Sequence, residues 1–198
     1  MTKLTVTTFL SVDGVMQAPG GPEEDTSGGF TLGGWTAPLF DEGVGLFIDR
    51  IFERSGAFLL GRHTYDVFAW YWPNPTSAED RESVVYQRLN ALPKYVASRT
   101  LTKVEWEGSS LLKDDAGDAV RELKETPLPG GRELQVHGSA GLLQTLLAED
   151  LVDEFNLIVF PVLLGPGKRL FGPGTLPGAL ELVESSTTDA GITLATYR

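Results

Sequence analysis

Residues 57–70 read AFLLGRHTYDVFAW and place an apolar strand directly before a helix. The run Ala57–Leu60 is typical of a buried strand, and Gly61 ends it. The segment that follows favours a helix that starts near His63 or Thr64 and continues until a Trp-Pro-Asn-Pro run stops it. A strand followed by a helix is the repeating unit of an α/β sheet.

The same alternation extends over the rest of the chain. Further strands are predicted at residues 3–11, 94–98, 133–137 and 154–160, and further helices at residues 39–53, 77–89, 114–124 and 139–148. The tail predicts an antiparallel hairpin from residues 180–188 and 192–198, around an Asp-Ala-Gly turn. We therefore expect one α/β domain over residues 1–198, with a mixed, mostly parallel central sheet and an antiparallel C-terminal hairpin.

Composition excludes several classes of protein. The 198 residues include 16 Lys and Arg against 27 Asp and Glu, for a net charge of −11, and they include no Cys. Absent cysteine excludes disulfide frameworks, thiolate zinc sites and cysteine nucleophiles, and the negative charge argues against nucleic-acid and anionic-membrane partners. The alternating N-terminus indicates a strand and not a signal peptide, so we expect a soluble, cytoplasmic protein without membrane spans.

A long loop is expected between the first strand and the first helix. Glycine and proline punctuate it, yet it also carries the large apolar residues Met16, Phe30 and Trp35. Loops of this length in compact domains usually cover a site or are disordered. The apolar residues favour an ordered loop over a site.

Three strand ends carry groups that suit an anion. In open α/β sheets, ligands lie beyond the carboxyl ends of the strands, so these turns can converge on one crevice. Backbone N–H groups at a helix start, arginine forks and hydroxyls all bind phosphate. The alternative is that the glycines only form turns and the arginines are solvated. The three turns are Gly61-Arg62-His63-Thr64, Ser98-Arg99-Thr100 and Gly138-Ser139-Ala140-Gly141.

Two aspartates are candidates for the substrate side. Asp13 follows the first strand and either contacts a polar heterocycle or stabilises a turn. Asp41, with Glu42 beside it, either faces the site or complements the dipole of the first helix. The loop Gly165-Pro166-Gly167-Lys168-Arg169 either closes over a ligand or forms a plain turn.

Other chemistries receive little support. His63 and His137 are the two histidines, and neither has a partner at metal-ligand spacing, so no metal site is predicted and His137 is expected to be structural. Ser139 lacks the Gly-x-Ser-x-Gly spacing of a nucleophile elbow. The aromatic block Phe68–Trp72 indicates core or an interface.

Five sequence motifs, taken in their order along the chain, resemble those of the dihydrofolate reductase-like superfamily. The resemblance is in particular to the reductase half of the bacterial riboflavin-pathway deaminase–reductase, the RibD C-terminal domain. Together they span nearly the whole chain. They are Ser11-Val12-Asp13-Gly14, Leu60-Gly61-Arg62-His63-Thr64-Tyr65, Ser98-Arg99-Thr100, Gly138-Ser139-Ala140-Gly141-Leu142-Leu143, and Leu151-Val152-Asp153-Glu154 followed by Pro161-Val162-Leu163-Leu164-Gly165.

The resemblance implies a three-layer α/β/α fold with about eight strands, a homodimer, and NADPH as cofactor. It assigns the cofactor phosphates to Gly61, Arg62, His63 and Thr64, and the adenosine 2′-phosphate to Ser98 and Arg99, with Thr100 beside them. It assigns the pyrophosphate to Gly138, Ser139 and Ala140, followed by Gly141. Asp13 and Asp41 are the candidate catalytic residues, Asp13 facing nicotinamide and substrate.

The leading hypothesis is a riboflavin-type NADPH-dependent reductase that acts on 5-amino-6-(5-phosphoribosylamino)uracil or a related flat heterocycle. The sequence holds no His-x-Glu or Pro-Cys-x-x-Cys motif of the deaminase half. One alternative is a pterin reductase of the same fold, which requires Asp41 or Glu42 in the site. Another is a non-catalytic nucleotide-binding protein, which predicts cofactor binding without turnover.

Overall fold

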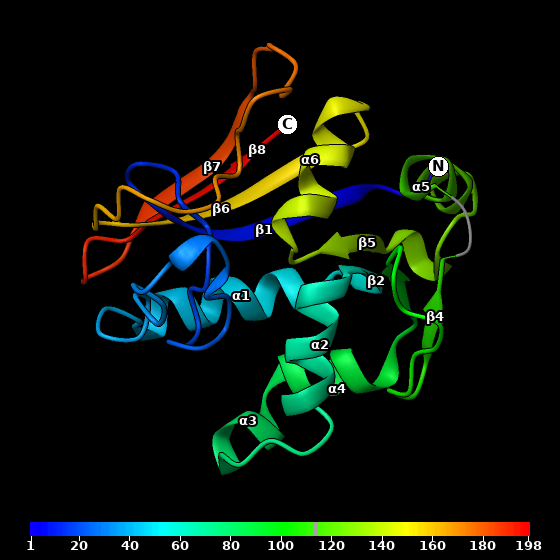
Figure 1. Cartoon of the computed structure of the whole chain (residues 1–198), viewed down its shortest axis with the longest axis horizontal. Coiled ribbons are helices and arrows are strands. Elements are labelled where there is room, and N and C mark those ends of the chain that lie inside the picture. Colours follow the sequence, from blue (N-terminus) through cyan, green and yellow to red (C-terminus); the bar gives the residue numbers. More distant parts are fainter. Residues whose placement is uncertain (113–114) are drawn as a thin grey trace.

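The computed structural model describes residues 1–112 and 115–198. In these two ranges, eight strands form one sheet in the order β4-β3-β2-β5-β1-β6-β8-β7 (Figure 1). Neighbours from β4 to β6 are parallel, whereas β8 is antiparallel to both β6 and β7. The predicted sheet is thereby confirmed. The strands are β1 Leu4–Ser11, β2 Ser55–Gly61, β3 Lys94–Ala97, β4 Ser109–Leu111, β5 Glu133–Val136, β6 Glu154–Phe160, β7 Leu182–Thr187 and β8 Thr193–Tyr197.

Helices cover both faces of the sheet and give the three-layer α/β/α fold. They are α1 Glu42–Glu53, α2 Arg62–Tyr71, α3 Ala78–Glu82, α4 Val84–Ala91, α5 Ala116–Glu125 and α6 Ala140–Ala148. Successive residues of a strand point to opposite faces. In β2, Leu59 packs with the core under α5 and α6, whereas Phe58 packs with the core under α1, α2 and α4.

Two predicted helices begin or divide differently from the sequence pattern. The first starts at Glu42 and not at residue 39, because the Asp41 carboxylate caps it by accepting from the Val44 N–H. The helix predicted over residues 77–89 is two helices, α3 and α4. Ser83 separates them, with extended backbone and a hydroxyl that accepts from the Tyr86 N–H.

The remaining differences are small. Strand β4 was not predicted and exists through parallel pairing with β3. The predicted helix start at Asp114 lies outside the described residues, and α5 is described from Ala116, with Asp115 as its cap. Within the aromatic block, Trp70 is 82% exposed, so this residue is not part of the core. In the part of the chain that the structure describes, no helix combines the length and apolarity needed to cross a membrane.

Candidate functional site

The three strand ends predicted to bind phosphate are neighbours in the sheet. Ala97 of β3 pairs with Gly61 of β2, and Val136 of β5 pairs with Leu59 of β2. The Gly61 N–H donates to the Gly138 carbonyl O at 3.1 Å. Because β3, β2 and β5 are parallel, their carboxyl ends and the three turns that follow lie along one edge of the sheet.

Close packing at this edge explains why Gly61 and Gly138 have no side chain. A Cβ at Gly61 would lie 2.7 Å from the backbone N of Ser139, and a Cβ at Gly138 would lie 2.5 Å from Oγ1 of Thr64. Gly138 also has a φ of +128°, which L side chains rarely adopt. The turn after β5 therefore lies directly against the start of α2.

Two helices begin at this contact, α2 after Gly61 and α6 after Ser139. Among the described residues, no side chain caps either N-terminus. The first N–H groups of a helix have no partner within it and carry a partial positive charge. Two such ends side by side offer the kind of N–H donors that can bind a phosphate or pyrophosphate. The peptide bond between Gly138 and Ser139 is cis.

Polar side chains surround these helix ends. Arg62 is half exposed and lies 3.3 Å, Nε to Oδ2, from Asp66 one turn along α2. The Ser98 hydroxyl accepts from the N–H groups of Thr100 and Leu101, which holds the turn after β3. Arg99 is exposed. The cofactor-binding set predicted from the sequence is thus brought to one edge.

His63 connects this edge to the long loop. Its Nε2 donates to the Glu24 carbonyl O at 2.6 Å, and it lies 4.0 Å from the Asp25 carboxylate. Asp25 also accepts from Lys168 Nζ at 2.6 Å. The contact between Asp25 and Lys168 was not predicted, because no local sequence pattern indicates a contact between two loops.

The long loop is packed and not merely extended over the surface. Phe30 and Trp35 are buried, and the Trp35 ring meets Phe160 of β6 edge-on at 5.6 Å between centroids. The Gln17 side chain donates to backbone carbonyls of the loop and accepts from the Lys168 N–H. The loop and the Gly165–Arg169 turn are therefore fastened to each other.

Asp13 lies at the same edge, beyond β1. Its carboxylate accepts from the Ser11 hydroxyl and from the N–H groups of Leu164 and Gly165. These bonds, with that of Ser11 the strongest, hold the pKa of Asp13 well below its usual range. At neutral pH, Asp13 is therefore an anion that fixes the Gly165–Arg169 turn. A catalytic role for it stays a prediction.

Asp41 has internal partners as well. It caps α1 and accepts from the Ala190 N–H in the turn between β7 and β8. The Thr188 hydroxyl, the strongest of its donors, lowers its pKa. The structure thus joins Asp41 to the C-terminal hairpin and not to the turns after β2 and β5, and its catalytic role also stays a prediction.

His137 is structural in its surroundings. Its ring stacks on Phe52, with centroids 4.7 Å apart, and Nε2 is buried without a hydrogen-bond partner among the described residues. Burial lowers the pKa of His137 to about 4. In residues 1–112 and 115–198, no group of three or more His, Cys, Asp or Glu is placed to hold a metal ion.

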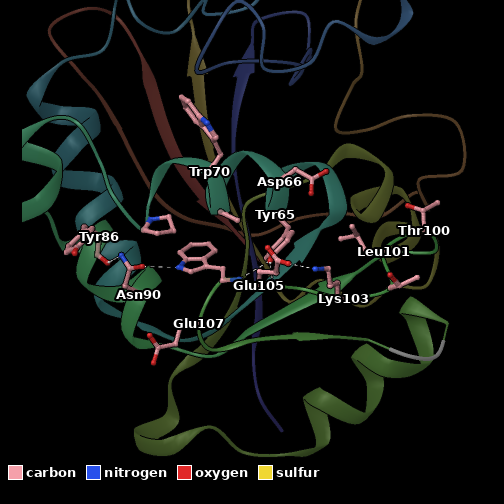
Figure 2. Close-up of a pocket in the computed structure, with 14 residues that line it drawn as sticks. Tyr65, Asp66, Trp70, Tyr86, Asn90, Thr100, Leu101, Lys103, Glu105 and Glu107 are labelled. Carbon is pink, nitrogen blue, oxygen red and sulfur yellow. Dashed lines mark hydrogen bonds and ion pairs between the residues drawn. The ribbon is translucent and has the colours of Figure 1, made fainter.

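A separate cavity of about 920 Å³ opens between α2 and the segment that joins β3 to β4 (Figure 2). Tyr65 anchors this segment, because its hydroxyl accepts from the N–H groups of Glu105 and Trp106. The Trp106 indole donates to Asn90 at 3.0 Å. The cavity shares only Thr100 with the predicted cofactor-binding residues.

Sequence comparison identifies relatives over most of the chain. The family model described as the RibD C-terminal domain matches residues 2–194. YyaP of Bacillus subtilis (strain 168), an uncharacterized protein, is 30% identical over 157 residues, which is 79% of this chain and 79% of that protein.

Solved structures share the fold at lower identity. A putative riboflavin biosynthesis protein from Shewanella sp. PV-4 is 23% identical, with a TM-score of 0.67, over 100% of this chain and 98% of that one. A pyrimidine reductase-like protein from Corynebacterium diphtheriae is 14% identical, with a TM-score of 0.65, over 100% and 91%. The third, a Thermotoga maritima diaminohydroxyphosphoribosylaminopyrimidine deaminase/5-amino-6-(5-phosphoribosylamino)uracil reductase, is 14% identical, with a TM-score of 0.63; this chain spans 56% of its length.

Proposed function

The chain belongs to the RibD C-terminal domain family, and on that premise we propose that it is an NADPH-dependent reductase of the riboflavin-pathway type. Its proposed substrate is 5-amino-6-(5-phosphoribosylamino)uracil or a related flat nitrogen heterocycle. The observation that carries this proposal is the contact between Gly61 and Gly138, which sets the N-termini of α2 and α6 side by side.

The residues at this edge fit a phosphorylated dinucleotide. The helix starts at Arg62 and Ala140 offer N–H groups to a pyrophosphate, and glycines keep their approach clear of side chains. Arg99 follows the neighbouring strand and is exposed, so it can pair with a 2′-phosphate. In a chain of net charge −11, this local set of cations and N–H groups favours an anionic ligand.

When bound, NADPH would supply a hydride. The chain would orient cofactor and substrate and exclude water. The turns after β2, β3 and β5 hold the phosphorylated half, and Asp13 fixes the Gly165–Arg169 turn beyond β1. The ion pair between Lys168 and Asp25 fastens that turn to the long loop. Two fastened loops at the site edge can exclude water while they orient the substrate.

Substrate choice separates this proposal from its rivals. NADPH oxidation should be measured by loss of reduced-nicotinamide absorbance with the phosphoribosylamino pyrimidine and, separately, with dihydrofolate. We expect turnover with the pyrimidine and little with dihydrofolate, because Asp41 is engaged in capping α1. The opposite preference would indicate a pterin reductase. Bound NADPH that neither substrate oxidises would indicate a non-catalytic protein.

A further inference from the structure

The cavity of about 920 Å³ beside α2 has walls that the fold holds in place (Figure 2). Tyr65 of α2 is buried, and its hydroxyl accepts from the N–H groups of Glu105 and Trp106. Asn90 of α4 accepts from the Trp106 indole and donates to the Tyr86 carbonyl. These bonds connect α2, α4 and the segment between β3 and β4. The cavity is therefore formed by the fold itself, as small-molecule sites usually are.

Aromatic rings make up much of these walls. Tyr65 and Trp106 are buried, Tyr86 is half-buried, and Trp70 of α2 is 82% exposed. An aromatic face attracts an ammonium or guanidinium group. Trp106 already holds one, since Nζ of Lys94, a residue that does not line the cavity, lies 4.6 Å from its ring centroid. Trp70 and Tyr86 are therefore the rings left for a bound cation.

The charged groups of the lining are mainly acidic. Three carboxylates, those of Asp66, Glu105 and Glu107, stand against the single ammonium of Lys103. Lys103 pairs with Glu105, and Asp66 lies 3.3 Å from Arg62. Glu107 forms no hydrogen bond or ion pair with the residues that the structure describes. This excess of carboxylates repels phosphates and favours a cation.

The C-terminal end of α2 adds acceptors to the cavity. Ala69, Trp70 and Pro73 all line it. A helical carbonyl accepts from the N–H four residues further on, but Pro73 has no N–H to offer to Ala69. The Asn74 N–H donates to the Tyr71 carbonyl at 3.2 Å and not to that of Trp70. In the part of the chain that the structure describes, two carbonyls at the negative end of the helix dipole are thus without a backbone donor.

We propose that this cavity binds an organic cation, a molecule with an apolar body and one or more ammonium groups. The rings bind the body and its charge, whereas Glu107 and the terminal carbonyls of α2 accept from its N–H groups. The volume of about 920 Å³ lies within the range of pockets that enclose small ligands, roughly 300–1,000 Å³.

Two kinds of molecule have this chemistry. Quaternary ammonium compounds have no N–H group and depend on the rings, whereas alkyl polyamines also need the acceptors. Either would occupy a site distinct from the proposed reductase site, because the cavity shares only Thr100 with the predicted cofactor-binding residues.

Indole resonances test the location of binding directly. The chain has four tryptophans, Trp35, Trp70, Trp72 and Trp106, so a ¹⁵N-labelled sample gives four indole N–H signals. Titration with benzyltrimethylammonium, and separately with spermidine, should shift the signals of Trp70 and Trp106 until they saturate. The signal of Trp35, which is buried under the long loop, should stay in place. Benzoate has a ring and the opposite charge, so it is the matched control and should shift none of them.

Substitution of two exposed residues tests the proposed contacts without disturbing the core. Trp70→Ala removes the exposed ring and should weaken benzyltrimethylammonium binding about two- to fivefold, whereas Trp70→Phe should retain most of the affinity. Glu107→Gln removes a carboxylate at nearly constant size and should weaken spermidine binding about two- to fivefold. Glu122→Gln changes the net charge equally but lies exposed on α5, on the other face of the sheet, and should leave both affinities unchanged.

Saturating NADPH separates this site from the proposed cofactor site. The dissociation constant of the cation should be the same with and without NADPH, because the two ligands use different residues. Four results would overturn the proposal: no saturable shift at Trp70 or Trp106 with either cation, equal shifts with benzoate, unchanged affinities in both Trp70→Ala and Glu107→Gln, or displacement of the bound cation by NADPH.

Discussion

The N–H of Gly61 donates to the carbonyl O of Gly138 at 3.1 Å, and this bond joins the end of β2 to the turn after β5. It brings together two helix starts that lie far apart in the sequence, at Arg62 and Ala140. Side chains larger than hydrogen have no room at either glycine. The anion binding proposed for this edge therefore rests on backbone geometry as much as on its arginines.

Replacing Gly61 should damage both stability and cofactor binding. In Gly61→Ala, the new Cβ would lie 2.7 Å from the Ser139 N and must push α6 away from α2. We expect a loss of about 1–3 kcal/mol in the free energy of unfolding and markedly weaker NADPH binding, measured by urea unfolding and fluorescence titration. Gly45→Ala, in α1 with open space around it, is the control and should stabilise slightly. Wild-type affinity in Gly61→Ala would place the cofactor elsewhere.

Arg99 should determine the preference for NADPH over NADH. A lost charge-assisted bond to phosphate costs about 1.5–3 kcal/mol, so Arg99→Ala should weaken NADPH binding roughly ten- to a hundredfold. NADH, which lacks the 2′-phosphate, should bind the variant as it binds the wild type. Arg81→Ala, an exposed arginine on α3, should change neither affinity. Parallel weakening of both cofactors in Arg99→Ala would contradict the assignment.

His137 should make the protein less stable in mild acid. Burial lowers its pKa in the folded state to about 4, against the ordinary value of 6.5. Between these values the unfolded chain binds a proton that the folded chain does not, so the free energy of unfolding falls as pH falls. The full effect amounts to about 3 kcal/mol by pH 4. Well above pH 6.5, where neither state binds the proton, the histidine contributes no slope.

Substitution isolates this contribution. His137→Phe can keep the stacking on Phe52 and removes the titrating group, so its unfolding free energy should decline less between pH 6.5 and 4. His63→Gln, at the other and exposed histidine, is the matched comparison. Chemical unfolding at several pH values measures both. If His137→Phe follows the wild-type curve, the acid sensitivity arises from other groups.

Glu154, the first residue of β6, should be a major stabilising charge at the end of the sheet opposite the candidate site. Its buried carboxylate binds Lys3, Arg198 Nε at 2.9 Å and Arg54 Nη2 at 3.6 Å. Glu154→Gln leaves these cations with a weaker partner and should cost about 2–4 kcal/mol, since the cations are partly exposed. Glu105→Gln, in the exposed pair with Lys103, should cost at most about 1 kcal/mol. Equal losses in urea unfolding would show that burial of Glu154 adds nothing.

Much of the fold was predictable because its strands and helices have strong periodic patterns. Strand β6 matches its predicted range at both ends. The differences arise where one contact overrides the pattern. Phe40 fits the apolar spacing of α1, but the Asp41 cap sets its start, and Ser83 divides a segment that reads as one helix. Strand β4 is short, and its pairing with β3 defines it, which no local pattern reports.

The position of the candidate site was also predictable from the sequence. Parallel strands that end in Gly61, Ala97 and Val136 must present their following turns at one edge, and they do. What could not be predicted is how the loops fasten together, because the contact of Lys168 with Asp25 spans most of the chain and follows no repeat. Stabilisation of a turn was one of the two roles predicted for Asp13, since an aspartate after a strand often holds a turn.

The most direct measurement is a titration of the wild-type protein with NADPH and, separately, with NADH, followed by quenching of tryptophan fluorescence. NADPH should bind at least about tenfold more tightly, because only its 2′-phosphate can pair with Arg99. Equal affinity for both would contradict the assignment of the 2′-phosphate. If neither cofactor binds, the central claim that the N-termini of α2 and α6 hold a dinucleotide is contradicted.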